Sequence, residues 1–264
     1  MKIATVGKGG SGKTTLAGTL ARILAADGPP LLAIDGDPNP NLALTLGMTP
    51  EQADRIVSIP PGVMAISESD GQRRLQMTVT PDELLARYGT KAPGGIALIV
   101  MGKPADGSAG SGCMCASHRA VRGLIQEMSA YGDYTVTDME AGLEHLKRGT
   151  AGNVDVMLIV AEPYYRSLEA AARTFRLAQE LGVPHLYVVA NKVKDAADLA
   201  AITEFCDKHA MPMIGTVGLD PEFVEAERNG RAPVDHAPDS AGVVAVRGIA
   251  DRLRQLKPGL ATAP

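Results

Sequence analysis

Short runs of apolar and β-branched residues recur along the chain, each next to a polar or glycine-rich break, and such runs are typical of buried strands. The runs that predict strands are Ile3–Val6, Leu31–Ile34, Val63–Ile66, Ile96–Val100, Tyr134–Thr137, Val156–Val160, Leu186–Val189 and Met213–Val217. Apolar residues at helical spacing lie between most of these runs, over Thr14–Ala26, His118–Ala130, Ser167–Leu181, Asp195–Lys208 and Ala241–Leu256. This alternation predicts the α/β class, with one doubly wound, mostly parallel sheet and helices on both faces.

Length and composition fit a single domain. The chain has 264 residues, of which 45% are hydrophobic and 21% charged, as in globular proteins. We expect residues 1–264 to form one domain. The segment Thr49 to Pro93 carries several prolines and charges but one strand-like run, so we expect it at the periphery of the sheet. The tail Lys257 to Pro264 is expected to be frayed and disordered.

Charge and cysteine content argue against several kinds of partner. The formal net charge of −4 provides no basic excess for nucleic acid or an anionic membrane. The longest apolar runs, such as Ile96–Met101, are far shorter than the ~20 residues that cross a bilayer. Three cysteines are too few for a secreted disulfide framework. We therefore expect a cytoplasmic protein that binds neither membrane nor nucleic acid and holds any anionic ligand in a local site.

Residues 7–14 match the phosphate-loop pattern G-x-x-x-x-G-K-S/T, between a predicted strand and a predicted helix. The loop residues whose backbone N–H groups can turn toward phosphates are Gly9, Gly10, Ser11 and Gly12. The helix N-terminus adds a favourable dipole. Lys13 is expected to reach the β- and γ-phosphates of ATP, Thr14 to ligate Mg²⁺ through its hydroxyl, and Thr15 to contact the α-phosphate.

A second lysine, Lys8, stands inside this loop. With it, the sequence K-G-G-x-G-K-T resembles the deviant phosphate loop of the family that includes nitrogenase iron protein, the arsenite-pump ATPase and the MinD and ParA positioning ATPases. In that family the first lysine reaches across a dimer to the partner's nucleotide. The resemblance thus implies a P-loop ATPase fold, a homodimer and a catalytic role for Lys8 in trans. A solvated loop lysine is the alternative.

Two acidic motifs follow predicted strands and resemble the switches of this family. Asp37, in Asp-Gly-Asp-Pro, resembles the first switch, whose aspartate orients and activates the attacking water; an ordinary turn is the alternative. Asp35 is expected either to cap a helix or to contact the Mg²⁺ shell. Asp138 resembles a Walker-B aspartate that holds Mg²⁺, with a helix N-cap as the alternative, and the N–H of Gly142 would sense the γ-phosphate.

Two further motifs are candidates for binding the base. Asn191 and Lys192 follow a predicted strand and resemble the adenine-binding motif of the family, in which the asparagine amide pairs with the base edge. Residues 219–221, Leu-Asp-Pro, follow another strand and are expected to close the other side of the base.

Cys113 and Cys115 lie in a segment rich in glycine and serine. Residues two apart in an extended segment point the same way, so both thiolates can bind one metal ion, Ni²⁺ or Zn²⁺. Two ligands leave the coordination incomplete, and a two-fold dimer would complete it with the same pair from each chain. Two buried small residues, or a strained disulfide, are the alternatives. Cys206 is expected in the core, and His118 and His145 are expected to be structural.

Several stretches together narrow the resemblance. They are Ser-Gly-Cys-x-Cys at 111–115, the second-switch stretch 138–150, Val-Ala-Glu-Pro at 160–163 and Asn-Lys at 191–192. With the phosphate loop they look like the CooC-type ATPases, which help to insert nickel into carbon monoxide dehydrogenase, over roughly residues 1–220. Ala116 departs from this pattern, because a proline is expected after the cysteines. A nitrogenase-type cluster would lack a ligand, because residues 138–142 contain no cysteine.

The resemblance therefore implies a homodimeric, ATP-hydrolysing nickel-insertion factor whose client is carbon monoxide dehydrogenase. The residues themselves support a nucleotide-switched thiolate site that accepts Ni²⁺ or Zn²⁺. A MinD- or ParA-like positioning ATPase is a second hypothesis, opposed by the acidic net charge and by a C-terminal end that makes a poor amphipathic helix. An iron–sulfur carrier or ATP-gated electron donor, with a cluster bridging two chains, is the third.

Overall fold

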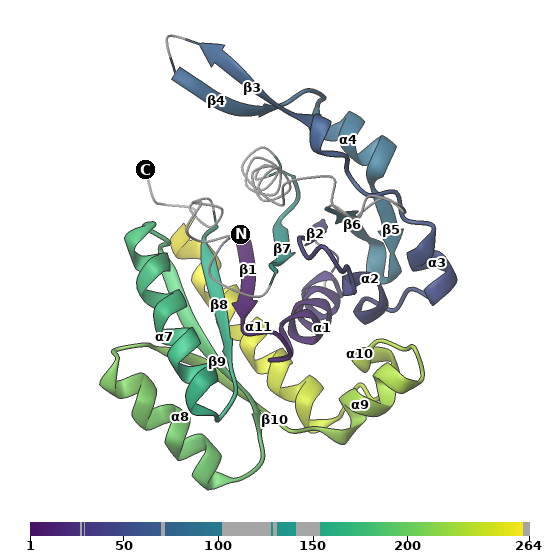
Figure 1. Cartoon of the computed structure of the whole chain (residues 1–264). Helices are drawn as coiled ribbons and strands as arrows, with labels where there is room; N and C mark the ends of the chain where they lie inside the picture. The colour runs from purple at the N-terminus through teal and green to yellow at the C-terminus, as the bar shows by residue number, and fades with distance from the viewer. Residues whose placement is uncertain are drawn as a thin grey trace.

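The computed structural model describes residues 1–26, 28, 30–69, 72–101, 128, 131–140 and 154–260. Eight strands in these ranges form the main sheet: β1 (Lys2–Gly7), β2 (Leu31–Asp35), β5 (Thr90–Ala92), β6 (Ile96–Val100), β7 (Tyr134–Asp138), β8 (Val156–Ala161), β9 (His185–Val193) and β10 (Met213–Gly218). Their spatial order is β10-β9-β8-β1-β7-β2-β6-β5 (Figure 1). Neighbouring strands run parallel except β5, which is antiparallel to β6. The predicted α/β fold with a mostly parallel sheet is confirmed.

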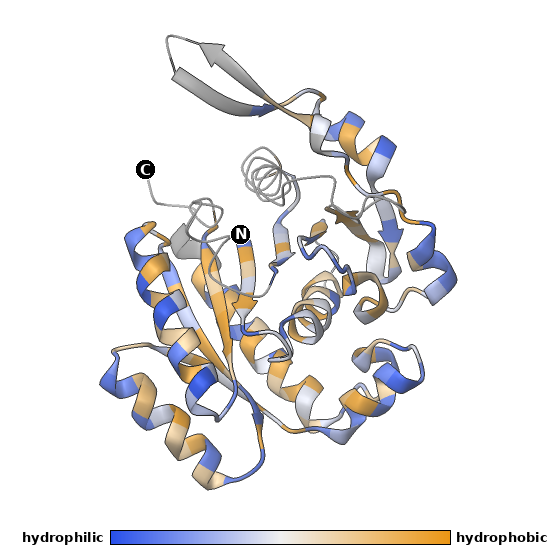
Figure 2. Ribbon diagram, in the orientation of Figure 1, coloured by the Kyte–Doolittle hydropathy of each residue, from blue (hydrophilic) through white to orange (hydrophobic). Residues whose placement is uncertain are grey.

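The middle of the sheet is buried on both faces, by apolar residues in most strands and by threonines and Asp138 in β7. Every residue of β2, β7 and β8 is buried, as expected for parallel strands covered by helices on both sides. Figure 2 shows β8 mostly in the orange of hydrophobic residues, whereas β7 is mostly pale and the helices also carry blue. β1 lies between β7 and β8, with Thr5 opposite both Asp138 and Leu158. The phosphate loop therefore begins in the middle of the carboxyl edge of the sheet.

Helices cover both faces of the sheet. The helices in the described ranges are α1 (Lys13–Ala25), α2 (Leu42–Thr45), α3 (Pro50–Asp54), α4 (Pro81–Tyr88), α7 (Tyr165–Glu180), α8 (Ala196–Lys208), α9 (Pro221–Arg228), α10 (Pro233–His236) and α11 (Ala241–Leu260). α1, α2 and α11 pack on one face around a core that includes Leu20 and Leu98. α4, α7 and α8 pack on the other face around Leu84 and Phe175. The two helical layers make the fold doubly wound, as predicted.

Four of the predicted helices correspond to α1, α7, α8 and α11. α11 continues to Leu260, beyond the predicted end at Leu256 and into the expected tail. The predicted helix His118–Ala130 lies outside the described residues, apart from Met128.

The segment 49–93 contains elements that its apolar pattern does not predict. It passes from α3 through a 3₁₀ turn, η1 (Pro61–Val63), to a hairpin of β3 (Met64–Ser69) and β4 (Gln72–Met77). This hairpin is a separate antiparallel sheet and projects from the body of the molecule in Figure 1. The segment then forms α4 and β5 and enters the 3₁₀ turn η2 (Pro93–Gly95). β4 and β5, with sequences QRRLQM and TKA, lack the apolar runs by which the other strands are predicted.

α1 and α2 approach closely at Gly18, and α2 follows loop 36–41, which contains Asp37. A Cβ atom on Gly18 would lie 2.7 Å from Thr45 Cβ and 3.0 Å from the carbonyl carbon of Thr45. The second of these is a backbone atom, so the overlap cannot be relieved by a side-chain rotation. The hydroxyl of Thr45 also donates to the carbonyl oxygens of Leu42, at 2.9 Å, and Thr14, at 3.4 Å.

Gly18→Ala is expected to destabilise the protein, because overpacking of about 1–3 kcal/mol outweighs the gain in helix propensity. Gly248→Ala is the matched control: Gly248 also lies in a helix, but a Cβ there meets open space. It should stabilise the protein by about 0.5–1 kcal/mol. The free energy of unfolding from chemical denaturation checks both. Equal gains for the two variants would contradict the close approach of α1 and α2.

Candidate active site

The phosphate loop lies where the order of strands changes direction across the sheet. From β1 the chain passes through α1 to β2 on one side, whereas β8, β9 and β10 lie on the other side. Ligands of open α/β sheets bind at such a point, outside the carboxyl ends of the strands. Gly10 and Gly12 have φ angles of 80° and 90°, in the left-handed region that favours glycine. These two glycines allow the backbone to curl from β1 into α1.

The N-terminus of α1 is open toward this loop. Its N-cap residue, Gly12, provides no side-chain cap, and the first turn contains no acidic residue. By contrast, the side chains of Thr80 and Asp195 accept hydrogen bonds from the first turns of α4 and α8. A helix start without a capping side chain keeps its N–H groups and positive dipole available to an anion. Lys13 adds a buried ammonium group, whose Nζ lies 3.5 Å from the carbonyl oxygen of Lys8.

Asp138 ends β7 beside the first turn of α1. Thr14 Oγ1 donates to Asp138 Oδ2 at 2.6 Å, and Thr5 Oγ1 donates to Oδ1 at 3.0 Å. Burial raises the pKa of Asp138 to about 6; Thr14, Lys13 and Thr5 act to lower it, and the charge of Asp37 acts to raise it. Hydroxyl and carboxylate oxygens are ligands that Mg²⁺ takes, so Thr14 and Asp138 fit the ion that accompanies a nucleotide. The contact of Thr5 with Asp138 was not predicted, because nothing in the sequence distinguishes this threonine from any other threonine in a strand.

Asp35 ends β2 and is fully buried, directly opposite Asp138 in the sheet register. Its Oδ1 accepts the N–H of Asp37 at 3.1 Å, and its Oδ2 accepts the N–H of Leu42, the first residue of α2, at 2.8 Å. Burial and the charge of Asp138 raise the pKa of Asp35 to about 7, against the lowering effect of these two donors. Asp35 therefore caps α2 and joins both ends of loop 36–41, which agrees with the capping alternative.

Asp37 and Lys8 lie nearer to solvent. Asp37 is half-buried, and its Oδ1 accepts the N–H of Asn39 at 2.9 Å. Its charge helps to raise the pKa of both Asp35 and Asp138, so it belongs to the same acidic cluster. Lys8 is exposed at the rim of the loop and makes no ion pair with another described residue.

An open cavity adjoins the phosphate loop between the ends of β9 and β10 and helices α1, α9 and α11. The apolar side chains that line it are Leu16, Val217, Leu219, Phe223, Val224 and Val246. Asn191 lines its polar end and donates from Nδ2 to the carbonyl oxygen of Ser11 at 2.7 Å. An apolar slot with an amide beside the phosphate loop suits a nucleotide base. Of the residues that the sequence predicted here, Asn191, Leu219 and Asp220 line the cavity and Pro221 does not. The other apolar lining residues were not predicted, because they depend on how α9 and α11 pack.

The remaining loop candidates are placed as follows. Thr15 and Lys192 line the cavity, and the ammonium group of Lys192 contacts the carbonyl oxygen of Gly10 and the carboxylate of Glu162. The Ser11 hydroxyl is buried and has no hydrogen-bond partner in the part of the chain that the structure describes. It lies 2.9 Å from where a Cβ of Gly7 would be, and the Ser11 N–H donates to the carbonyl oxygen of Lys8 at 3.1 Å.

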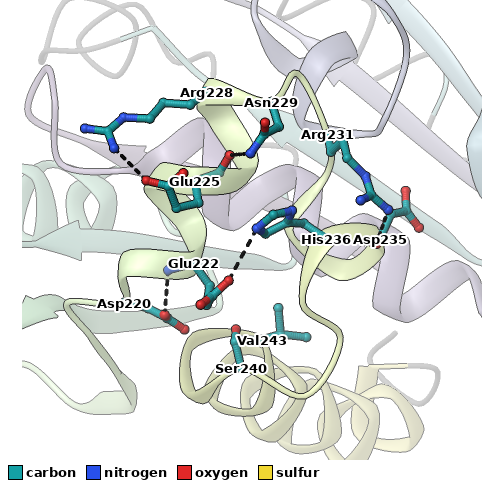
Figure 3. A network of polar contacts seen from close by, with 10 residues as sticks. All are labelled: Asp220, Glu222, Glu225, Arg228, Asn229, Arg231, Asp235, His236, Ser240 and Val243. Carbon is teal, nitrogen blue, oxygen red and sulfur yellow. Dashed lines mark hydrogen bonds and ion pairs between the residues drawn. The ribbon is translucent and has the colours of Figure 1, made fainter.

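Asp220 fixes the outer wall of the cavity. Its Oδ1 accepts the N–H of Glu222 in α9 at 3.0 Å, and its Oδ2 accepts the N–H of Gly242 in α11 at 2.6 Å. Burial acts to raise the pKa of Asp220, but these donors and the Ser240 hydroxyl outweigh it and lower the pKa. His236 of α10 lies 3.3 Å from Glu222 (Figure 3). The wall formed by α9 is thereby tied to both α10 and α11.

Several predicted residues lie outside the described residues: Cys113, Cys115, His118, Gly142 and His145. Within the described ranges, no group of three or more His, Cys, Asp or Glu side chains could hold a metal ion. Cys206 is buried in α8, and burial raises the pKa of its thiol to about 11, so it is a core residue. Of the helices that the structure describes, none combines the length and apolar character of a membrane span.

The fold and the site together define a class of protein. A glycine loop between β1 and the open N-terminus of α1, at the switch point of a doubly wound sheet, is the arrangement of a P-loop nucleotide-binding protein. The family model described as "CobQ/CobB/MinD/ParA nucleotide binding domain" matches residues 2–234. The chain belongs to this family.

Individual relatives agree with this assignment. The chain is 35% identical over 244 residues to the carbon monoxide dehydrogenase accessory protein CooC of Rhodospirillum rubrum, covering 90% of this chain and 91% of that protein. It is 36% identical to an uncharacterized ATP-binding protein of Methanocaldococcus jannaschii, covering 88% and 90%. The solved structure of the MinD cell division protein of Aquifex aeolicus has a TM-score of 0.71 at 23% identity and covers 96% of each chain. The phosphate loop, the family and these relatives make the chain an ATPase.

Asp35→Asn should flatten the pH dependence of stability in the nucleotide-free protein. The pKa of Asp35 is raised from 3.8 to about 7, so its stabilising contribution is complete at low pH and is lost as pH rises through about 7. Asparagine takes up no proton. The melting temperature, measured in a chelator from about pH 8 down to about pH 5.5, should therefore rise less in Asp35→Asn than in the natural protein.

Asp239→Asn, at an exposed aspartate, is the control and should keep the natural pH dependence. Parallel curves for Asp35→Asn and the natural protein would show that Asp35 takes up no proton in this range.

Proposed function

We propose that this chain is an ATP-driven accessory factor that delivers nickel to a carbon monoxide dehydrogenase. The observation that carries the proposal is the 35% identity to CooC over about nine-tenths of both chains. Identity that came from a shared phosphate loop alone would cover only a short part of the two chains. The Cys-x-Cys pair at 113 and 115 supplies thiolates, which are suitable ligands for a metal cargo.

The ATP site is assigned as follows. Backbone N–H groups of residues 9, 10 and 12–15 and the Lys13 ammonium would bind the phosphates, and Asn191 would bind the adenine edge. Thr14 and Asp138 would hold Mg²⁺, which neutralises charge on the phosphates. Asp37 would orient the attacking water, since it lies in the same acidic cluster at the end of β2. Gly142 would sense the γ-phosphate through its N–H.

The proposed role of Lys8 requires a dimer. Lys8 is exposed, whereas Lys13 is buried under the same loop, so one chain already has a lysine for its own phosphates. A second ammonium at the rim, which makes no ion pair within the described ranges, suits the nucleotide of a second copy, where it would stabilise charge in the transition state as an arginine finger does. ATP would then draw two chains together.

The metal cargo would lie between the two chains. Cys113 and Cys115 from each chain would give four thiolates, which suit Ni²⁺ if the site is near square-planar and Zn²⁺ if it is tetrahedral. ATP can drive such a site only if it binds the closed dimer more tightly than the open one. Hydrolysis would then loosen the dimer and release the metal ion to the client enzyme.

Lys8→Ala is expected to leave ATP binding within about threefold of the natural value and to lower kcat by about a thousandfold or more, as for loss of an arginine finger. Lys208→Ala, at an exposed lysine of α8, is the control and should hydrolyse ATP normally. Phosphate release and equilibrium ATP binding are the two measurements. Normal turnover by Lys8→Ala would refute the action of Lys8 in trans.

Metal content is expected to depend on the cysteine pair. Anaerobically reduced protein titrated with Ni²⁺ or Zn²⁺ against a chelator should bind about one ion per two chains. The Cys113→Ala/Cys115→Ala variant should lose this ion, whereas Cys206→Ala, at the buried core cysteine, should retain it. Equal metal binding by all three proteins would make the pair structural and favour a positioning ATPase instead. A brown protein after anaerobic purification would favour the iron–sulfur alternative.

A further inference from the structure

A phosphate loop can bind an anion only if its carbonyl oxygens point away from it. In a trans peptide the C=O and N–H groups point in opposite directions, so a carbonyl held outward aims the following N–H the other way. Two consecutive carbonyls of this loop are held from outside. Asn191 donates to the carbonyl oxygen of Ser11 at 2.7 Å, and the ammonium of Lys192 donates to that of Gly10.

Two neighbouring residues of a strand would not normally reach the same loop, because their side chains point to opposite faces. Here β9 pairs Asn191 with Val217 of β10 and then Val193 with Gly218, so Lys192 is the extra residue of a bulge. Lys192 has a φ of 56°, which is rare for a residue with a side chain. A bulge of this kind re-aims a side chain. It turns the Lys192 side chain toward the loop that Asn191 already contacts.

Glu162 holds the other end of this contact. It follows β8, and its Oε1 lies 3.0 Å from Lys192 Nζ. Its side chain is 13% exposed, and its own N–H donates to Ser167 Oγ at 3.0 Å, which fixes the backbone at that point. The ammonium group of Lys192 is thus held between a carboxylate and a loop carbonyl. Because the carboxylate neutralises it, its effect on a bound phosphate is geometric more than electrostatic.

We propose that Lys192 and Glu162 are positioning residues, which hold the Gly10–Ser11 peptide outward so that the phosphate loop is shaped for a nucleotide before it binds. The N–H of that peptide donates to the carbonyl oxygen of Lys8 at 3.1 Å, so the turn that leads to Gly12 and Lys13 is closed on both sides. Without Lys192, the flanking glycine leaves this peptide free to rotate and to present its oxygen to the phosphates. Part of the binding energy would then go into ordering the loop.

The test is the dissociation constant of ADP and of a non-hydrolysable ATP analogue. Lys192→Met should weaken both by about tenfold, and by the same factor, because loop ordering does not depend on the γ-phosphate. Glu162→Gln should weaken both in the same direction, and the double variant should be no weaker than Lys192→Met. Lys192→Arg, which keeps a cation and its donors, should recover binding to within about threefold of the natural protein.

The Lys192→Gly variant distinguishes the effect of the Lys192 side chain from the effect of its backbone conformation. Glycine favours a positive φ, so this variant should fold at least as stably as the natural protein yet bind both nucleotides as weakly as Lys192→Met. Ala210→Gly is the matched control, since Ala210 has a φ of 51° after the end of α8. It should gain the same backbone relief and bind nucleotides normally.

Three results would overturn the proposal. Tighter binding in Glu162→Gln would mean that the freed ammonium contacts the nucleotide directly, and a larger loss for the ATP analogue than for ADP in Lys192→Met would mean the same. Normal binding by Lys192→Gly would mean that the loop keeps its shape without the contact.

Discussion

A phosphate-binding loop must present many N–H groups and no carbonyl oxygen to its ligand. This requirement constrains most of the structure. The loop begins at the end of β1, an interior strand of the sheet that lies between β8 and β7. The first turn of α1 has no capping side chain, and Gly10 and Gly12 take φ angles that favour glycine. Loop carbonyls are bound from outside by Asn191 and Lys192. The uncapped start of α1 leaves backbone N–H donors available to the ligand. A helix start tolerates such donors only where an anion or water satisfies them.

The same edge of the sheet buries two carboxyl groups side by side, Asp35 and Asp138. Such burial is unfavourable for two charges, and the raised pKa of each reports that cost. The site offsets it with hydroxyl and N–H donors and with the Lys13 ammonium. A divalent cation would relieve it further, because Asp138 already contacts Thr14 in the first turn of α1. Asp35 meanwhile caps α2 and holds both ends of loop 36–41.

Much of this arrangement could be predicted from the sequence, because it is encoded locally. Apolar runs marked the central strands, and the spacing of Gly7, Gly12 and Lys13 marked the phosphate loop. Other features depend on contacts between distant segments. Polar β4 and β5 carry no apolar run, Thr5 has no signal beyond its strand, and the wall of the base cavity arises from the packing of α9 and α11. The bulge at Lys192 has no signal in the sequence either, so the contact of its side chain with the phosphate loop could not be predicted.

In the proposed function, the nucleotide state controls the affinity for the metal. This coupling is measured as the dissociation constant of Ni²⁺ for anaerobically reduced protein, with ADP and with a non-hydrolysable ATP analogue. Ni²⁺ is expected to bind more tightly with the analogue, by about tenfold, and the analogue more tightly with Ni²⁺ by the same factor, because coupling between sites is reciprocal. Equal Ni²⁺ affinity in the two nucleotide states would show that the nucleotide does not control the metal site.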